Sequence, residues 1–270
     1  MSVRQFVLNL AAVPVKVAFL GAWFALLMVW ERLVPAAPKP AEMGLTQAAR
    51  IGGNATLGAI NVVIWLAVTL PLTLLALSQA PERGFAEWRG TWATDLTGLL
   101  VDIVILDLFA YFWHRAAHEV NGLWRFHEVH HRDEFLDVTT GLRFHFGETI
   151  FGSAARAVVV LGVSCPIEHV IVFDVLVLVM NWFSHSNLRL PGWFEKPLSI
   201  LIVTPSIHWT HHRTSKPEID QNYAVIFSLW DWIFRTRAQR GRRIGMQVGV
   251  RHHSDEALWR LLILPFRPRE

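Results

Sequence analysis

The sequence predicts an all-α, integral-membrane helical bundle that carries a histidine-rich helical cap. Of the 270 residues, 53% are hydrophobic and only 17% are charged, a balance that disfavours both a disordered chain and an ordinary soluble enzyme. Thirteen tryptophans against two tyrosines suit a protein with much of its surface near lipid headgroups. The 13 histidines are clustered rather than scattered, so we expect the cap to carry the function.

Four apolar regions define the predicted membrane part. A bilayer core of about 30 Å needs about 20 apolar helical residues to cross it. The candidate spans lie within residues 17–30, 57–77, 96–113 and 157–183. The last region is interrupted by Cys165-Pro166, and proline disfavours helical geometry in the residue before it. We therefore expect two short membrane-inserted helices there rather than one straight span.

Charge is distributed unevenly along the chain, whose formal net charge is +3. Residues 186–270 contain 13 Lys and Arg against 7 Asp and Glu. Because an excess of Lys and Arg marks the cytoplasmic side of a membrane protein, we expect this part and the cap to face the cytoplasm. In so apolar a chain a basic segment suits anionic lipid headgroups, and no nucleic-acid partner is expected. Glu31-Arg32 follows the first apolar segment where a signal peptide would have a small-residue cleavage site, so no secretory signal is expected.

Eight of the histidines fall in three short runs with helical spacing. The runs are His114 and His118; His127, His130 and His131; and His208, His211 and His212. Residues three or four apart share one face of a helix, and imidazole is the commonest metal-binding side chain. An interfacial or core histidine explains one such residue but not three clusters, each just outside a membrane segment. The runs therefore predict metal ligation.

The number of ligands limits the kind of metal site. A catalytic zinc usually takes three protein ligands and keeps one open position, so eight histidines are too many for one ion and suit two. The single cysteine, Cys165, excludes a multi-cysteine zinc site and an iron–sulfur cluster held by this chain alone. Imidazole binds several transition metals well, and the spacing alone does not separate iron from zinc or manganese.

Two other interpretations are open at this point. His127-Glu128-x-x-His131 satisfies the H-E-x-x-H pattern of zinc peptidases, in which the glutamate is the general base. A membrane-embedded metallopeptidase would need one more ligand, for which Asp231 is a candidate, and it leaves the other two runs unexplained. A metal-binding or scaffold protein without turnover is the third interpretation.

Residues 107–236 resemble the fatty acid hydroxylase/sterol desaturase superfamily of integral-membrane di-iron enzymes. Its three boxes are matched by Asp107-x3-Tyr111-x2-His114-Arg115-x2-His118, by His127-x2-His130-His131, and by Thr204-Pro205-Ser206-x-His208-x2-His211-His212. Asp137-Val138-Thr139-Thr140 and Arg143-Phe144-His145-x2-Glu148 resemble a segment of its bacterial members, and Asn181–Asn187 contains the family's intervening histidine, His185. Arg132, Phe146 and Arg235 depart from the usual residues, which leaves the substrate open.

The resemblance implies two non-haem irons that activate O2 and oxidise a C–H bond of a lipid, fatty acyl or sterol-like, by hydroxylation or desaturation. The lipid would come from the bilayer, and a separate ferredoxin-like or cytochrome-like donor would supply electrons. It also implies a bacterial inner membrane. The chain then divides into N-terminal spans and loops (1–95), a catalytic domain (96–240) with a broken membrane region (157–183), and a basic C-terminal tail (241–270).

Further residues are candidates for the site. His185 is expected to be a ninth ligand, since ionisable groups inside a membrane are usually functional. Possible ligands or supports of the ligands are His145, Asp107, Glu128, Asn187 and Asp231. Asp107 lies two helical turns before His114, and two roles are open for it: it accepts an imidazole N–H, or it makes a hydrogen bond in helix packing. Glu119, Glu148, Asp220 and Asn222 are unranked candidates for the same supporting role. His252 and His253 are expected to be solvated.

Overall fold

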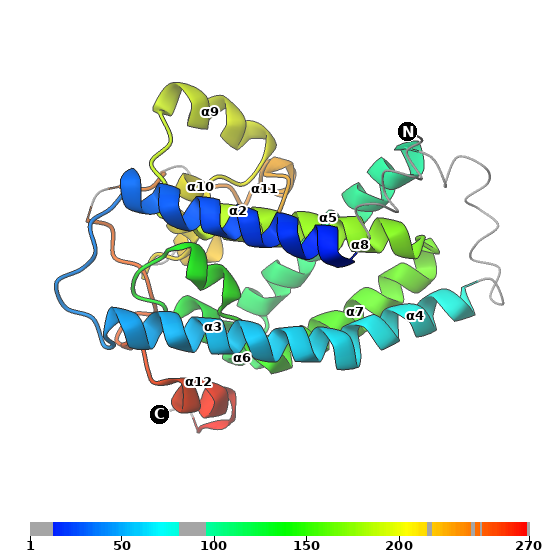
Figure 1. Ribbon diagram of the computed structural model, residues 1–270, viewed down its shortest axis with the longest axis horizontal. Coiled ribbons are helices and arrows are strands. Elements are labelled where there is room, and N and C mark those ends of the chain that lie inside the picture. Colours follow the sequence, from blue (N-terminus) through cyan, green and yellow to red (C-terminus); the bar gives the residue numbers. More distant parts are fainter. Residues whose placement is uncertain (1–12, 81–95, 215–217, 239–240, 244, 269–270) are drawn as a thin grey trace.

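The computed structural model describes residues 13–80, 96–214, 218–238, 241–243 and 245–268. The regular elements of these ranges are all helical, and the only β pairing among them is in isolated bridges. Long helices run side by side along the longest axis, and the short helices gather toward one end of them (Figure 1). The predicted all-α class is confirmed.

Five helical segments are long and apolar enough to cross a membrane. They are α2 (Val13–Leu33); α3 (Gln47–Ile64), which continues through the π-turn η1 (Trp65–Thr69) into α4 (Leu70–Gln79); α5 (Leu96–Glu119); α7 (Phe146–Val163); and α8 (Ile167–His185). Together with the relatives described below, they support an integral membrane protein.

The break between α7 and α8 is where the sequence predicts it, but the two helices are not short. Ser164 ends α7 in a left-handed conformation at φ 56°, and Pro166 precedes the first residue of α8. The helices contain 18 and 19 residues, close to the length that a span needs. The expectation of short inserted helices was wrong because α7 begins eleven residues before the predicted region.

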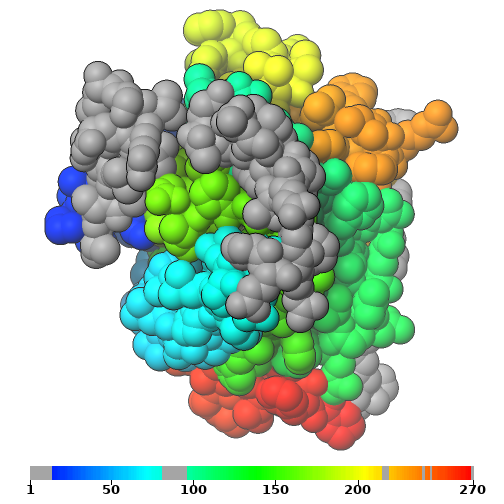
Figure 2. Space-filling view, turned by 90° about the vertical axis from the view of Figure 1, so that its right-hand side faces the viewer, coloured from blue at the N-terminus to red at the C-terminus, as the bar shows by residue number. Residues whose placement is uncertain are grey.

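The short helices form the cap at one end of the bundle. They are α6 (Asn121–His131), η4 (Val138–Leu142), α9 (Gly192–Leu201), α10 (Pro205–His211), η5 (Glu218–Asp220), α11 (Leu229–Ile233), α12 (Leu258–Ile263) and η6 (Leu264–Phe266). A single residue, Val120, separates α5 from α6, so the chain turns sharply where the first histidine run ends. In the space-filling view, the C-terminal segment lies along the underside of the bundle (Figure 2).

The apolar core lies between the long helices. Leu27 of α2, Leu106 of α5, Val160 of α7 and Phe173 of α8 are all buried in one cluster. Between membrane helices such side chains stabilise the bundle through close van der Waals packing, because lipid tails are as apolar as the core itself. This packing fixes the ends of α5 and α8, which carry histidines into the cap.

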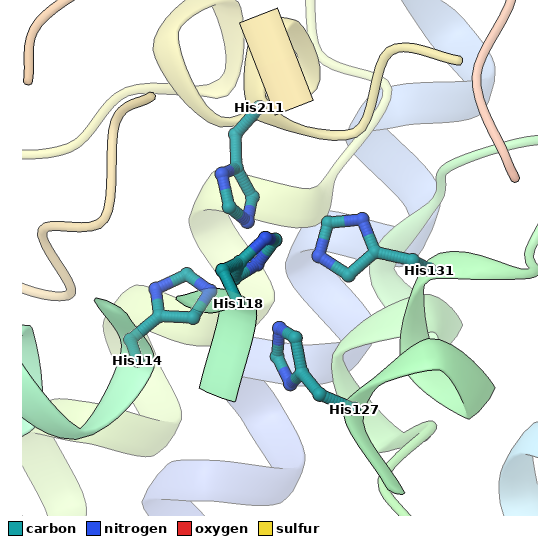
Figure 3. A group of neighbouring side chains, drawn as sticks. All are labelled: His114, His118, His127, His131 and His211. Atoms are coloured by element: carbon teal, nitrogen blue, oxygen red, sulfur yellow. The ribbon is translucent and has the colours of Figure 1, made fainter. Parts of the chain in front are cut away.

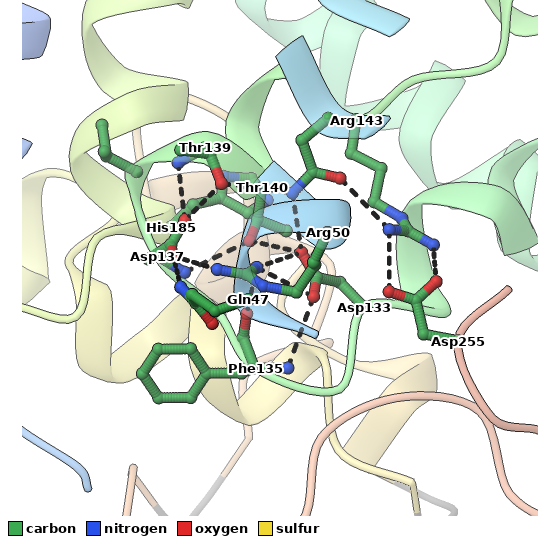
Figure 4. Close-up of polar contacts among 12 residues, drawn as sticks. Gln47, Arg50, Asp133, Phe135, Asp137, Thr139, Thr140, Arg143, His185 and Asp255 are labelled. Carbon is green, nitrogen blue, oxygen red and sulfur yellow. Dashed lines mark hydrogen bonds and ion pairs between the residues drawn. The ribbon is translucent and has the colours of Figure 1, made fainter. Parts of the chain in front are cut away.

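A buried polar network joins α3 to the loop after α6 (Figure 4). Arg50 donates to both oxygens of Asp133, at 3.0 and 2.8 Å, and also pairs with Asp137. Arg143 pairs with Asp255, which comes from the C-terminal part of the chain. Burial would raise the pKa of Asp133, but the guanidiniums of Arg50 and Arg143 outweigh it and hold that pKa below its usual value. Buried charges are tolerated because each has a partner.

Candidate metal centre

The nine histidines predicted as ligands converge in two neighbouring groups. The five-histidine group contains His114, His118, His127, His131 and His211, and the four-histidine group contains His130, His185, His208 and His212. Within each group, one nitrogen from every ring lies within 4.8 Å of those of the others. Figure 3 shows the five rings of the first group turned toward one another from three separate segments.

Helix geometry divides the second and third histidine runs between the two groups, while both histidines of the first run belong to the five-histidine group. Successive residues of an α-helix are about 100° apart, so the adjacent His130 and His131 of α6 point into different groups. His211 of α10 likewise faces the five-histidine group, while its neighbour His212 faces the other. The two groups are in direct contact, because the ring of His131 in one group stacks on the ring of His212 in the other, with centroids 4.2 Å apart.

Hydrogen bonds fix which nitrogen faces the centre of the five-histidine group. The Nδ1 atoms of His114 and His211 lie 2.8 and 2.7 Å from the carbonyl oxygens of Tyr223 and Gln221. A carbonyl only accepts, so Nδ1 carries the proton and Nε2 keeps its lone pair. His127 Nδ1 is held in the same way, at 2.8 Å from the carboxylate of Glu148. The Nε2 atoms of His127 and His211 are buried without a hydrogen-bond partner.

In the four-histidine group, the hydrogen bonds of His130 and His185 leave the Nε2 lone pairs of the two rings facing each other. His130 Nδ1 lies 3.1 Å from the Arg143 carbonyl, and His185 Nδ1 lies 2.6 Å from the Asn181 carbonyl. Both Nε2 atoms are therefore unprotonated in the neutral rings, yet they are only 3.0 Å apart. Two lone pairs do not make a hydrogen bond. A shared cation between them is the arrangement that this geometry suits.

Five cap histidines are held in the neutral form near pH 7. Burial, with a smaller contribution from neighbouring histidines, lowers the pKa of His130, His131, His208 and His212 well below the ordinary value. Burial also lowers the pKa of His211, to about 3. Neutral imidazole is the form that binds metal, so protons do not compete for these rings near pH 7.

Of the two roles open for Asp107, the structure shows structural hydrogen bonds and, among the residues it describes, no contact with an imidazole. Its carboxylate accepts the backbone N–H groups of Ile226 and Phe227, both at 3.0 Å, and Nε1–H of Trp230 at 2.7 Å. The loop before α11 turns toward α5, and its N–H groups need an acceptor when buried. Asp107 therefore anchors this loop to α5.

Three other candidates also lie outside the two groups. His145 Nδ1 accepts the N–H of Gly147 at 2.9 Å and so caps α7. Glu128 pairs with Arg132 at 2.8 Å. Asn187 binds both backbone polar groups of Ala37, at 3.0 and 2.9 Å. Each of these three side chains makes a structural hydrogen bond or ion pair, which explains why a polar residue occupies its position.

Asp231 and Glu148 help to hold ligand histidines in place through hydrogen bonds on the side away from the centre of the group. Asp231 accepts the N–H of Tyr223 at 2.9 Å, and the carbonyl of the same residue accepts from His114. Glu148 binds His127 directly. The sequence could not show the other supports, because they are backbone carbonyls, which every residue has.

A third set of potential ligands lies at the other end of the bundle. Asp102 and His169 are 2.6 Å apart, and Cys165 lies near both. His169 is 16 residues before His185 on α8, about 24 Å along the helix. The sequence singled out none of these three as partners.

The sequence model of the fatty acid hydroxylase family matches residues 99–236. The ornithine lipid hydroxylase of Rhizobium tropici is 24% identical over 78% of this chain and 63% of its own length. The alkylglycerol monooxygenases of Danio rerio and Homo sapiens are 32% and 31% identical over 58% and 55% of this chain, and 33% and 31% of their own lengths.

The chain thus spans less than two thirds of the length of these curated relatives. No solved structure matches it. The matched residues extend from early in α5 to the loop after α11, and they include all nine converging histidines. The family match and the three histidine runs agree, and the chain belongs to the fatty acid hydroxylase family.

Proposed function

We propose that the two histidine groups hold two iron ions and that the protein is a membrane-bound, non-haem di-iron oxygenase acting on a lipid. The facing lone pairs of His130 and His185, 3.0 Å apart, are the observation that carries this proposal, because a bound cation would remove their repulsion. The names of the relatives support a lipid-modifying oxygenase. Hydroxylation and desaturation of a C–H bond both remain within the proposal.

When bound, iron would supply the electrons to O2 and the oxidising power that an unactivated C–H bond requires. The chain's own contribution is positioning. Carbonyls and Glu148 hold the ligand rings in one tautomer and one orientation. Burial of the cap histidines excludes water, and their neutral rings leave few side-chain protons in the site.

The arrangement of partners is part of the same proposal. The lipid would enter from the bilayer between the spans, and electrons would come from a separate ferredoxin-like or cytochrome-like protein. The excess of Lys and Arg after residue 185 supports a cap that faces the cytoplasm of a bacterial inner membrane. Residues 96–240 would then be the catalytic domain, between the N-terminal spans and the basic tail.

The zinc-peptidase interpretation is not favoured. His127 and His131 belong to a group with three further histidines, which a zinc ion with an open position does not need. Glu128, the base in that interpretation, is paired with Arg132. The family assignment points to lipid oxidation instead.

Metal analysis of the detergent-purified protein tests the proposal. We expect two irons per chain, and loss of iron in His118→Ala and His212→Ala, which remove one ligand from each group. His253→Ala is the matched control, because this histidine is exposed and should leave the iron content unchanged. One zinc per chain with peptidase activity would refute the proposal. Retained iron without O2 consumption, under reducing conditions and across a panel of lipids, would favour a metal-binding protein without turnover.

A further inference from the structure

A cleft of about 980 Å³ opens beside the five-histidine group. His118 and Trp124 form its inner wall, and the segment after α12 lines the opposite side. The Trp124 ring lies 5.1 Å from the ring of His118 and 5.4 Å from that of His131, between centroids. A molecule in this cleft would therefore contact the outside of the proposed metal centre.

Four arginines line the cleft, and two of them have no carboxylate partner in the described ranges. Glu256 pairs with Arg132 at 2.8 Å and with Arg267 at 3.0 Å, which neutralises part of the charge. Arg125 donates to a backbone carbonyl, and Arg251 is exposed. Glu128, the second partner of Arg132, and Asp220 also line the cleft. Four arginines against three carboxylates leave an excess of positive charge, which favours an anionic group such as a phosphate or a carboxylate.

The rim of the cleft lies next to the membrane part. On the inner side of α12, Leu261 packs against Leu57 of the spanning helix α3 and against Val129 of α6. On its outer side, Trp259 and Phe266 of the α12–η6 segment are 59% and 64% exposed. Aromatic side chains exposed beside a membrane helix suit the lipid interface. Figure 1 shows α12 directly below α3 and α6.

We infer that this cleft binds the anionic headgroup of an amphipathic lipid substrate, whose chain passes over the α12 rim into the bilayer. The inference rests on the proposed function, which it makes more specific. It places the carbons next to the headgroup, rather than the end of the chain, nearest to the five-histidine group. The headgroup would then select the substrate.

Lipid binding to the metal-free protein in an uncharged detergent tests the inference. The probes are lauroyl lysophosphatidate and monolauroylglycerol, which share one acyl chain and differ by the phosphate. Calorimetry should give an affinity for lysophosphatidate at least about tenfold higher, as expected for one or two charge contacts near the surface. Equal affinities for the two lipids would overturn the inference.

Variants locate the binding to the cleft. The double variant R125Q/R251Q should lose about tenfold in affinity for lysophosphatidate and keep its affinity for monolauroylglycerol. R189Q/R235Q is the control, because both of its arginines are exposed and neither lines the cleft. If R125Q/R251Q does not fold, R251Q alone should still weaken binding. An unchanged affinity in the folded variant would contradict the inference.

A competition experiment separates a lipid headgroup from a free anion. A large excess of inorganic phosphate should leave lysophosphatidate bound, because the acyl chain adds to the affinity. Displacement by inorganic phosphate would mean that the cleft takes free phosphate, and the lipid inference would fail. All these measurements use metal-free protein, so their failure is distinguishable from a failure to bind iron.

Discussion

Substitution of Asp255 by asparagine tests whether the C-terminal part of the chain supports the metal centre. The Asp255 and Arg143 side chains are 0% and 1% exposed, and a neutral amide at this position would leave the guanidinium without its carboxylate. Breaking a buried ion pair costs about 3–5 kcal/mol. We expect the lower end, about 3 kcal/mol, because Arg143 keeps its bonds to the Val129 carbonyl and to Asn54.

The assay is thermal unfolding of the metal-free protein in detergent. A loss of about 3 kcal/mol corresponds to a fall in Tm of roughly 6–12 °C for a chain of this size. The Arg143 carbonyl accepts from His130, so a displaced Arg143 should also lower the affinity for iron. Loss of such a supporting contact typically costs about 10–100-fold.

Glu256→Gln is the matched control, one residue further along the chain. Its carboxylate is 20% exposed, and its partner Arg132 keeps an ion pair with Glu128. We expect a loss below about 1 kcal/mol and an unchanged affinity for iron. If Asp255→Asn behaves like this control, the reasoning about the buried pair is refuted.

Three further predictions concern other parts of the molecule. Burial lowers the pKa of His211 to about 3 from 6.5, and between these two pH values the unfolded chain binds more protons than the folded protein. The Tm of the metal-free protein should therefore fall as the pH is lowered below about 6.5. A constant Tm would contradict this. Glu148→Gln should weaken iron binding about 10–100-fold in a chelator competition. Glu119→Gln, which changes the exposed ion pair with Arg115, should leave iron binding unchanged. Equal effects of the two substitutions would exclude a specific role for Glu148. Trp193 is 79% exposed on α9, a helix without buried residues, and such a tryptophan suits the lipid interface. Headgroup-brominated lipids should therefore quench more tryptophan fluorescence in the wild type than in Trp193→Phe. Equal quenching in the two proteins would place α9 away from the bilayer.

The ligand set and the long helices could be predicted from the sequence because both leave a periodic signal. Uncharged stretches locate α2 and the α3–α4 segment, and histidines three or four residues apart identify shared helix faces. The division into two groups was not predicted. Adjacent residues such as His130 and His131 look like one unit in the sequence, and their separation follows only from the direction of each ring in the folded cap.

The buried ion pairs were missed because their members are far apart in the chain and follow no period. Arg50 directly precedes an uncharged stretch, and no carboxylate near it in the sequence indicates a partner. It lies in α3, fully buried, and its partner Asp133 is 83 residues away. Asp255 lies 112 residues after Arg143 in what was expected to be a basic tail. His252 and His253, close by, are exposed as predicted.

The pairing of Arg143 with Asp255 has a consequence for the order of events during synthesis. All nine histidines leave the ribosome before Asp255 does, so a partly made chain already contains every donor atom but lacks the carboxylate that secures the carbonyl behind His130. The centre takes its final shape only when this late segment returns to α3 and α6. Stable insertion of iron would accordingly wait until Asp255 has been made.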